Sequence, residues 1–258
     1  MPSNASTKTT SSFSIAATRR ARIHSLFCCS RPPHATRRVK RSQKIEHEYS
    51  LRRELEAAWA AHPCAVSRYH EQPVLVRQDP GGEPLSRLVR GPMEAGQFLR
   101  IAVGLTAALR ELHQRQLIHK DLKPINILVD PVNGRSWLTG FGIASRQSRE
   151  RQAPAPPEFI AGTLPYVAPE QTGRMNRSID SRSDLYALGV TLYEVLTGSL
   201  PFSASEPMEW GHCHIASPPI SPAERAKDVP AASVTICFIG SMCFPSRCHP
   251  SGNGKTTS

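Results

Sequence analysis

Apolar positions recur at helical spacing in three stretches of the chain. The first begins at Pro92, a residue suited to the start of a helix, and its apolar side chains share one face: Phe98, Ile101, Ala102, Leu105, Ala108, Leu109 and Leu112. The second stretch, SDLYALGVTLYEVLTG, is apolar almost all round, which predicts a buried helix that ends at Gly198. Residues 45–62 contain neither Gly nor Pro and also show helical spacing, so a third helix is expected there.

Short β-rich runs lie between these helices. Residues 73–77, PVLVR, predict a strand that stops at the turn-rich segment DPGGEP. The stretch ILVDPVNGRSWLT places two β-rich runs around Asn133-Gly134, a dipeptide typical of a tight hairpin turn. Since the strands are mostly early and helices dominate the C-terminal part, the pattern favours an α+β fold over alternating βαβ units.

The basic residues that give the chain its net positive charge are concentrated at its N-terminal end. Of 258 residues, 39% are hydrophobic and 21% charged, values typical of a globular protein. Residues 1–45 contain no Asp or Glu and ten Lys or Arg, so only about +1 of the net charge of +11 falls on the rest. Such a segment has little apolar surface to offset its ordering entropy, and residues 1–44 are therefore predicted to be a disordered basic tail.

The tail allows three interpretations: a solvated extension, an organelle-targeting peptide, or a segment that binds an anionic surface. Nucleic-acid binding is disfavoured, because few aromatic residues are interleaved with the arginines. Seven cysteines, an odd number without CxxC spacing, favour reduced thiols over disulfides or a zinc site, as in a cytoplasmic protein. No apolar run approaches the roughly 20 residues needed to span a membrane.

The candidate chemistry lies in HKDLKPIN, between the long amphipathic helix and the hairpin. A phosphoryl-transfer site needs a carboxylate that accepts a hydroxyl proton, a cation near the transferred charge, and an oxygen ligand for a metal ion. Asp121, Lys123 and Asn126 supply these three groups in this order. The sequence therefore predicts Asp121 and Lys123 as catalytic residues and Asn126 as a metal and cofactor ligand.

Four motifs together resemble the protein kinase family. HKDLKPIN resembles its catalytic loop, GFG its DFG motif, and AGTLPYVAPE the segment that ends in Ala-Pro-Glu at Glu170. Asp184 falls where kinases keep the aspartate that braces the catalytic loop. Lys123, and Thr163 in a Gly-Thr pair, resemble serine/threonine rather than tyrosine kinases. More narrowly, residues 149–202 are similar to the kinase-like module that begins large bacterial and fungal proteins with an ATPase module and a sensor histidine kinase.

This resemblance implies a two-lobe kinase fold with an incomplete N-lobe (45–80), a truncated C-lobe (81–232) and an irregular tail (233–258). It also implies ATP and Mg²⁺ as cofactors, with ATP under the hinge at Gln78 and Asp79, and a protein substrate or signalling partner. His119, Thr163, Glu170 and Asp184 would have structural roles.

The sequence departs from the family pattern in the N-lobe and at Gly140. No Gly-rich loop or β3 lysine is visible; Val39-Lys40 is only a faint candidate for that lysine. Glu48 resembles the helix αC glutamate that would pair with the lysine and serve the cofactor, but an ordinary exposed helix charge is the other interpretation. Gly140 replaces the aspartate that binds metal.

Two functions remain open at this stage. One is a protein serine/threonine kinase domain with weak or lost activity. The other is a pseudokinase that acts as a nucleotide-binding or protein-interaction module.

Overall fold

The structure, a computed structural model, describes residues 35–70, 72–147, 161–175 and 177–225, with side chains from residue 41 onward. Most of the basic tail expected at 1–44 and the whole irregular segment expected at 233–258 lie outside these residues.

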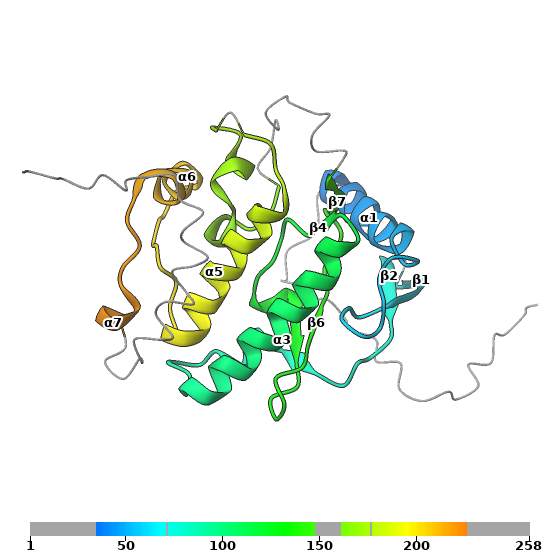
Figure 1. Cartoon of the computed structure of the whole chain (residues 1–258). Coiled ribbons are helices and arrows are strands. Elements are labelled where there is room, and N and C mark those ends of the chain that lie inside the picture. Colours follow the sequence, from blue (N-terminus) through cyan, green and yellow to red (C-terminus); the bar gives the residue numbers. More distant parts are fainter. Residues whose placement is uncertain (1–34, 71, 148–160, 176, 226–258) are drawn as a thin grey trace, which may run out of the picture.

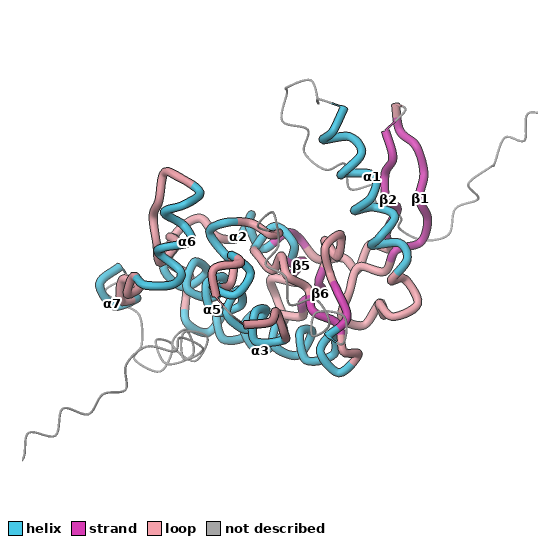
Figure 2. The backbone as a smooth tube through the Cα atoms, turned by 90° about the horizontal axis from the view of Figure 1, so that it is seen from above, coloured by secondary structure: helices cyan, strands magenta, loops and turns pink. Residues whose placement is uncertain are grey.

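Two unequal parts lie side by side in Figure 1. The smaller part holds helix α1 (Ala35–Ser50) and the antiparallel strands β1 (Pro63–Tyr69) and β2 (Gln72–Arg77). The larger part holds the helices α3 (Ala95–Gln114), α5 (Ser181–Thr197), α6 (Pro207–Ala216) and α7 (Pro222–Arg225). Seen from above, α1, β1 and β2 project from one end of the molecule (Figure 2). The predicted α+β, two-lobe fold is confirmed.

Short strands and turns connect the two parts and frame the loops between them. Strands β3 (Glu83–Pro84), β5 (Ile127–Val129) and β6 (Ser136–Leu138) form an antiparallel sheet in the order β3-β5-β6, and β4 (Leu117–Ile118) pairs with β7 (Ser145–Arg146). The short helices are α2 (Leu85–Leu88) and the 3₁₀ helices η1 (Pro124–Asn126), η2 (Leu164–Tyr166) and η3 (Pro169–Thr172). Strands β5 and β6 are the predicted hairpin, and Gly134 in its turn has φ +76°.

The long helix α3 starts three residues later than predicted, because a side chain rather than the proline ring begins it. The Glu94 carboxylate accepts hydrogen bonds from the Gly96 and Gln97 amides at 2.7 and 2.9 Å, which satisfies two of the free N–H groups of the first turn. All seven residues of the predicted apolar face are buried. Helix α5 ends at Gly198 as predicted, with Gly198 in the left-handed region at φ +74°.

Helix α1 differs most from the prediction. It starts at Ala35, inside the segment expected to be disordered, and ends at Ser50 instead of residue 62. Backbone pairing with β6 takes the following residues out of helical geometry. The Leu138 amide donates to Trp59 O at 2.9 Å, the Ala61 amide donates to Leu138 O at 3.0 Å, and Ala60 forms a parallel bridge with Leu138. Tertiary pairing has overridden local helix propensity here.

Strand β1 was missed by the sequence analysis because its side chains carry no burial pattern: Pro63 is buried and the six residues that follow are exposed. The strand is fixed instead by its register with β2, in which Tyr69 pairs with Gln72 and Val66 with Leu75.

One hydrophobic core joins the segment after α1 to the larger part. It combines Leu55 and Trp59, from that segment, with the apolar faces of α3 and α5 and with Phe141, which is fully buried. Because these side chains pack closely together, the segment after α1 is anchored rigidly to the larger part. Among the described residues, no helix has both the length and the apolar character needed to cross a membrane.

Candidate active site

The segment HKDLKPIN lies between β4 and β5 and is held from beneath by Asp184, in the first turn of α5. The Asp184 carboxylate is fully buried and accepts hydrogen bonds from the backbone amides of His119 at 2.8 Å and Lys120 at 2.9 Å. The ring of His113, at the end of α3, contacts the same carboxylate at 2.9 Å. Three donors thus satisfy a buried carboxylate and fix the backbone just before Asp121.

Asp121, Lys123 and Thr163 form a closed triangle of hydrogen bonds. The Lys123 ammonium donates to Asp121 Oδ2 at 2.8 Å and to Thr163 Oγ1 at 2.5 Å, and the Thr163 hydroxyl donates to Asp121 Oδ1 at 2.7 Å. Side-chain exposure is 17% for Asp121 and 19% for Lys123, so both groups reach solvent from a largely enclosed position. The carboxylate and the ammonium predicted from sequence therefore meet, and Thr163 joins them from a segment about 40 residues further along the chain.

His119 supports this triangle from the core side. Its Nδ1 accepts the Asp121 amide at 3.3 Å, so its Nε2 carries the proton and donates to Thr139 O at 2.9 Å. The imidazole ring also packs against Phe141, with the ring centroids 4.8 Å apart. His119 thereby links the backbone of Asp121 to the segment that contains Gly140.

Asn126 lies against Gly140, where the family would have a carboxylate. The Asn126 amide donates from Nδ2 to Asp121 O at 2.8 Å and to Asp121 Oδ2 at 3.2 Å. A Cβ atom built on Gly140 would lie 2.7 Å from both Cγ and Oδ1 of Asn126. The asparagine side chain therefore occupies the space that a side chain at position 140 would need.

This arrangement does not fit the Mg²⁺ ions that the resemblance implies. Mg²⁺ prefers carboxylate oxygens in an octahedral shell. Gly140 offers no side chain, and both Asp121 oxygens already accept hydrogen bonds. Within the part of the chain that the structure describes, no cluster of three or more His, Cys, Asp or Glu side chains could hold a metal ion. Asn126 Oδ1 is the ligand atom that remains from the predicted set.

Glu170 and its neighbour Gln171 tie the segment after Ala161 to the larger part. Ser183 donates to Glu170 Oε1 at 2.5 Å, and both residues are buried. Gln171 donates from Nε2 to Lys120 O at 2.9 Å and Ala161 O at 3.2 Å, and its Oε1 accepts the Ala168 amide at 3.0 Å. Sequence reasoning missed Gln171; its place directly after the Ala-Pro-Glu element was the available signal.

A second carboxylate in this region is that of Glu194 in α5, which forms a hydrogen bond with Tyr166. The Tyr166 hydroxyl donates to Glu194 Oε2 at 2.6 Å. Burial raises the pKa of Glu194, and the tyrosine hydrogen bond partly offsets this effect. Burial and the neighbouring glutamate also raise the pKa of Tyr166. This pair fixes η2, and with it the approach to Thr163, against the larger part.

Glu48 is not an exposed helix charge, so that interpretation is wrong. Its side chain is buried, and Arg77 of β2 donates to Glu48 Oε1 from Nε at 2.9 Å and from Nη2 at 2.8 Å. The sequence analysis offered Val39-Lys40 as a faint candidate for the paired lysine, but both residues lie within α1 itself rather than on a strand that precedes it. Arg77 supplies the cation instead.

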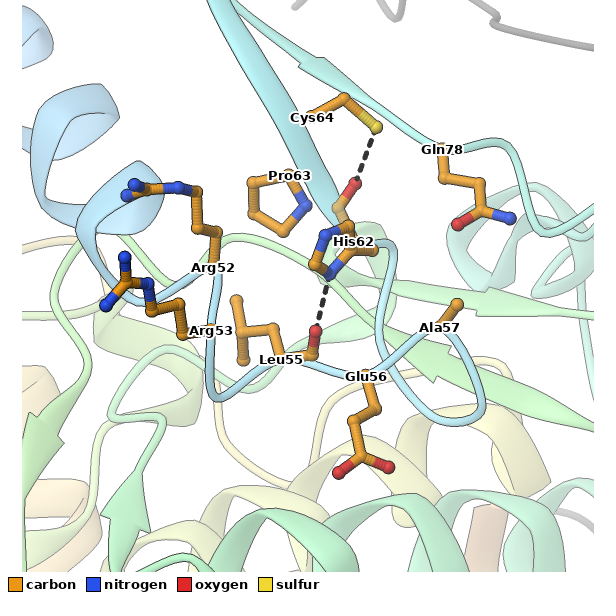
Figure 3. Close-up of a pocket in the computed structure, with 9 residues that line it drawn as sticks. All are labelled: Arg52, Arg53, Leu55, Glu56, Ala57, His62, Pro63, Cys64 and Gln78. Atoms are coloured by element: carbon orange, nitrogen blue, oxygen red, sulfur yellow. Dashed lines mark hydrogen bonds between the residues drawn. The ribbon is translucent and has the colours of Figure 1, made fainter. Parts of the chain in front are cut away.

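Gln78 and Asp79 lie on the connection from β2 to β3. The Gln78 amide donates to His62 O at 2.8 Å, and Asp79 Oδ1 accepts the Gly81 amide at 2.9 Å. Gln78 lines an open cavity of about 650 Å³ with Leu55, His62 and Cys64 (Figure 3). No contact joins Gln78 to Asp121, Lys123 or Asn126 among the described residues, so its predicted role toward a cofactor stays a prediction.

Comparisons with known proteins agree with this geometry. A family model described as "Protein kinase domain" matches residues 24–233. The chain is 34% identical to the serine/threonine-protein kinase PknB of Mycobacterium leprae over 191 residues, which are 69% of this chain and 30% of the relative. It is 36% identical over 142 residues to the serine/threonine-protein kinase pkn3 of Myxococcus xanthus, 53% of this chain and 26% of the relative.

The chain belongs to the protein kinase family. The match from residue 24 to 233 covers most of its length, and the relatives share the serine/threonine class that Lys123 and Thr163 predicted. The chain spans about 30% of the length of the PknB relatives that it matches.

Proposed function

We propose that this chain is a protein serine/threonine kinase domain that transfers a phosphoryl group from ATP to a protein hydroxyl. The observation that carries the proposal is the closed triangle of Asp121, Lys123 and Thr163. A carboxylate and an ammonium held at 2.8 Å, beside a third group that fixes both, make a preorganised site for a hydroxyl nucleophile. The kinase relatives support the same conclusion.

Each residue of the triangle has a distinct task. Asp121 orients the attacking hydroxyl of the substrate and accepts its proton as the bond to phosphorus forms. Lys123 lies beside that carboxylate and stabilises negative charge on the transferred group. Thr163 holds the carboxylate and the ammonium in one orientation, and it ties them to the segment on which a protein substrate would lie. Glu48 and Arg77 hold α1 on β2.

ATP is the proposed phosphoryl donor by family membership, with the hinge at Gln78 and Asp79 as its predicted adenine side. Mg²⁺ would screen the phosphate charge if it were bound, but the residues present do not supply its carboxylate ligands. Loss of such a contact removes several kcal/mol of transition-state stabilisation, and each ~1.4 kcal/mol is tenfold in rate. The proposed kinase is therefore a slow one.

A second candidate function is a pseudokinase that binds a nucleotide or a signalling protein without turnover. The contact between Asn126 and Gly140 favours it, because this contact leaves the metal side of the site incomplete. A protein partner is expected under both functions. A cytoplasmic location, or an organelle reached through the basic tail, also remains a prediction.

Phosphate transfer to casein and to the chain itself separates the two candidates. The chain is incubated with γ-labelled ATP and compared with Asp121→Asn and with Asp130→Asn, a matched change in the hairpin turn. A kinase labels serine and threonine, loses about 10²-fold or more of its rate in Asp121→Asn, and keeps it in Asp130→Asn. Labelling that is equal in all three proteins, or absent from all three, contradicts the kinase proposal, and complete absence favours the pseudokinase.

A further inference from the structure

The space beside Gly140 is closed by a side chain rather than left open. Gly140 has φ +80°, and the ideal Cβ position at this residue lies within 2.9 Å of Cγ, Oδ1 and Nδ2 of Asn126. Contacts under 3.0 Å do not occur for real Cβ atoms, so a carboxylate here requires Asn126 to move. The position of the missing metal ligand is thus filled by the amide of its neighbour.

Asn126 is not free to move away. Its Nδ2 donates to the Asp121 carbonyl at 2.8 Å and to the Asp121 carboxylate at 3.2 Å, while its backbone carbonyl accepts the Thr139 amide at 2.9 Å. Two acceptors at Nδ2 also fix the orientation of the amide, so Oδ1 is the side-chain atom of Asn126 left to act as a ligand. Rotation of this side chain would break both of its hydrogen bonds.

Asp121 cannot replace the lost ligand without breaking its own contacts. Its Oδ1 accepts the Thr163 hydroxyl, and its Oδ2 accepts both the Lys123 ammonium and the Asn126 amide. The ammonium at 2.8 Å already balances the carboxylate charge, and a divalent cation beside it would meet like-charge repulsion. The remaining ligand is the neutral Oδ1 of Asn126. A single neutral oxygen does not compensate Mg²⁺ for the water molecules that it would have to release.

We propose that this kinase site receives its nucleotide without a divalent cation. The inference rests on the proposed function in one respect, that a nucleoside triphosphate is the ligand. The chain's own side chains and bulk counterions then have to balance the triphosphate charge, and Mg²⁺ adds nothing to the affinity.

Nucleotide binding with and without metal tests this directly. The full chain is titrated with ATP, once in excess Mg²⁺ and once in EDTA, and the rise in melting temperature gives the affinity in each medium. The two dissociation constants are expected to agree within about twofold, whereas a metal-dependent site would bind at least about tenfold more tightly in Mg²⁺. Asn126→Ala serves as the variant, because it removes the last candidate ligand. It is expected to leave the Mg²⁺-to-EDTA ratio unchanged.

A second measurement keeps the inference separate from the proposed function. Mn²⁺ prefers the same oxygen ligands as Mg²⁺, and its free form is counted by electron paramagnetic resonance. Stoichiometric Mn²⁺ binding to the chain that Asn126→Ala abolishes would overturn the inference, as would an affinity for ATP that depends on Mg²⁺. ATP binding that is strong only in Mg²⁺ would overturn the inference and leave the kinase proposal intact. If the chain binds ATP in neither medium, no nucleotide is received, and the inference and the kinase proposal both fail.

Discussion

Glu48 of α1 and Arg77 of β2 form a buried ion pair in which Nε and Nη2 of the arginine both contact one carboxylate oxygen, at 2.9 and 2.8 Å. Side-chain exposure is 5% for Glu48 and 18% for Arg77. Helix α1 also contacts the segment after Gly140 through His47, whose Nε2 donates to Ala144 O at 2.6 Å. The ion pair and this hydrogen bond together fix α1 between β2 and the segment after Gly140.

Removal of one partner of this pair should cost much more than removal of an exposed charge. Arg77→Met leaves the Glu48 carboxylate buried and unpaired, and we expect it to lower the free energy of unfolding by about 3 kcal/mol. Arg110→Met is the matched control, since its side chain is 70% exposed and its loss should cost at most about 1 kcal/mol. Urea denaturation measures both. Equal stability of the two variants would show that the pair does not hold α1. The double variant Glu48→Leu/Arg77→Met should recover part of the lost stability, because it leaves no unpaired carboxylate buried.

The contact between Asn126 and Gly140 predicts that replacement by alanine costs more stability at Gly140 than at another glycine of similar backbone geometry. Gly81 has φ +88° and open space around its Cβ position, whereas Gly140 has φ +80° and faces Asn126. Gly81→Ala should therefore cost about 1 kcal/mol, the conformational penalty alone. Gly140→Ala should cost about 1–3 kcal/mol more, because Asn126 must be displaced. Thermal unfolding measures the stability of both variants. An equal loss of stability at the two positions would contradict the close contact between Gly140 and Asn126.

His214 of α6 predicts a loss of stability in mild acid. Its ring contacts the Tyr186 hydroxyl and the Leu164 carbonyl, each at 2.7 Å, and stacks on Trp210. Burial lowers the pKa of His214 from 6.5 to about 4, although the bond to Leu164 acts in the opposite direction. The unfolded state thus takes up a proton before the folded state does as the pH falls below 6.5. The contribution of neutral His214 to the free energy of unfolding is therefore fully present above pH 6.5. About 3 kcal/mol of it is lost as the pH falls to 4.

The pH dependence of urea denaturation checks this prediction. His214→Phe should be less stable near neutral pH, because it loses two hydrogen bonds, but its stability should fall less steeply between pH 6.5 and 4. His212→Gln, an exposed position on the same helix, should keep the slope of the wild type. A slope that His214→Phe leaves unchanged would assign the acid sensitivity to other groups.

Thr163 should act on the reaction through its hydroxyl. Thr163→Val keeps the shape of the side chain but loses both the hydrogen bond to Asp121 and the one from Lys123. We expect kcat to fall by up to about 10²-fold, since the carboxylate and the ammonium lose their common support. Thr163→Ser restores the hydroxyl and should recover most of the rate. If Val and Ser give the same kcat, Thr163 has no positioning role.

Several features were predictable from the sequence because they depend on local patterns. The apolar face of α3, the buried helix α5 with its terminal Gly198, and the hairpin of β5 and β6 follow from periodicity and turn chemistry. The approach of Asp121 to Lys123 was also expected, because the two residues lie two positions apart in one short loop.

Other features depend on pairing between distant segments and could not be read from local patterns. Helix α1 ends early because residues near Trp59 pair with Leu138, about 80 residues away. Arg77 as the partner of Glu48 follows from the position of β2 beside α1, which no spacing rule specifies. Gln171 likewise lies about 50 residues from the Lys120 carbonyl that it binds.

The rate of phosphate transfer by the wild type and by Asp121→Asn tests the central claim most directly. The account predicts slow labelling of serine or threonine from ATP, of similar rate in Mg²⁺ and in EDTA, and a loss of about 10²-fold or more in Asp121→Asn. A wild type whose labelling is unchanged by Asp121→Asn would contradict it.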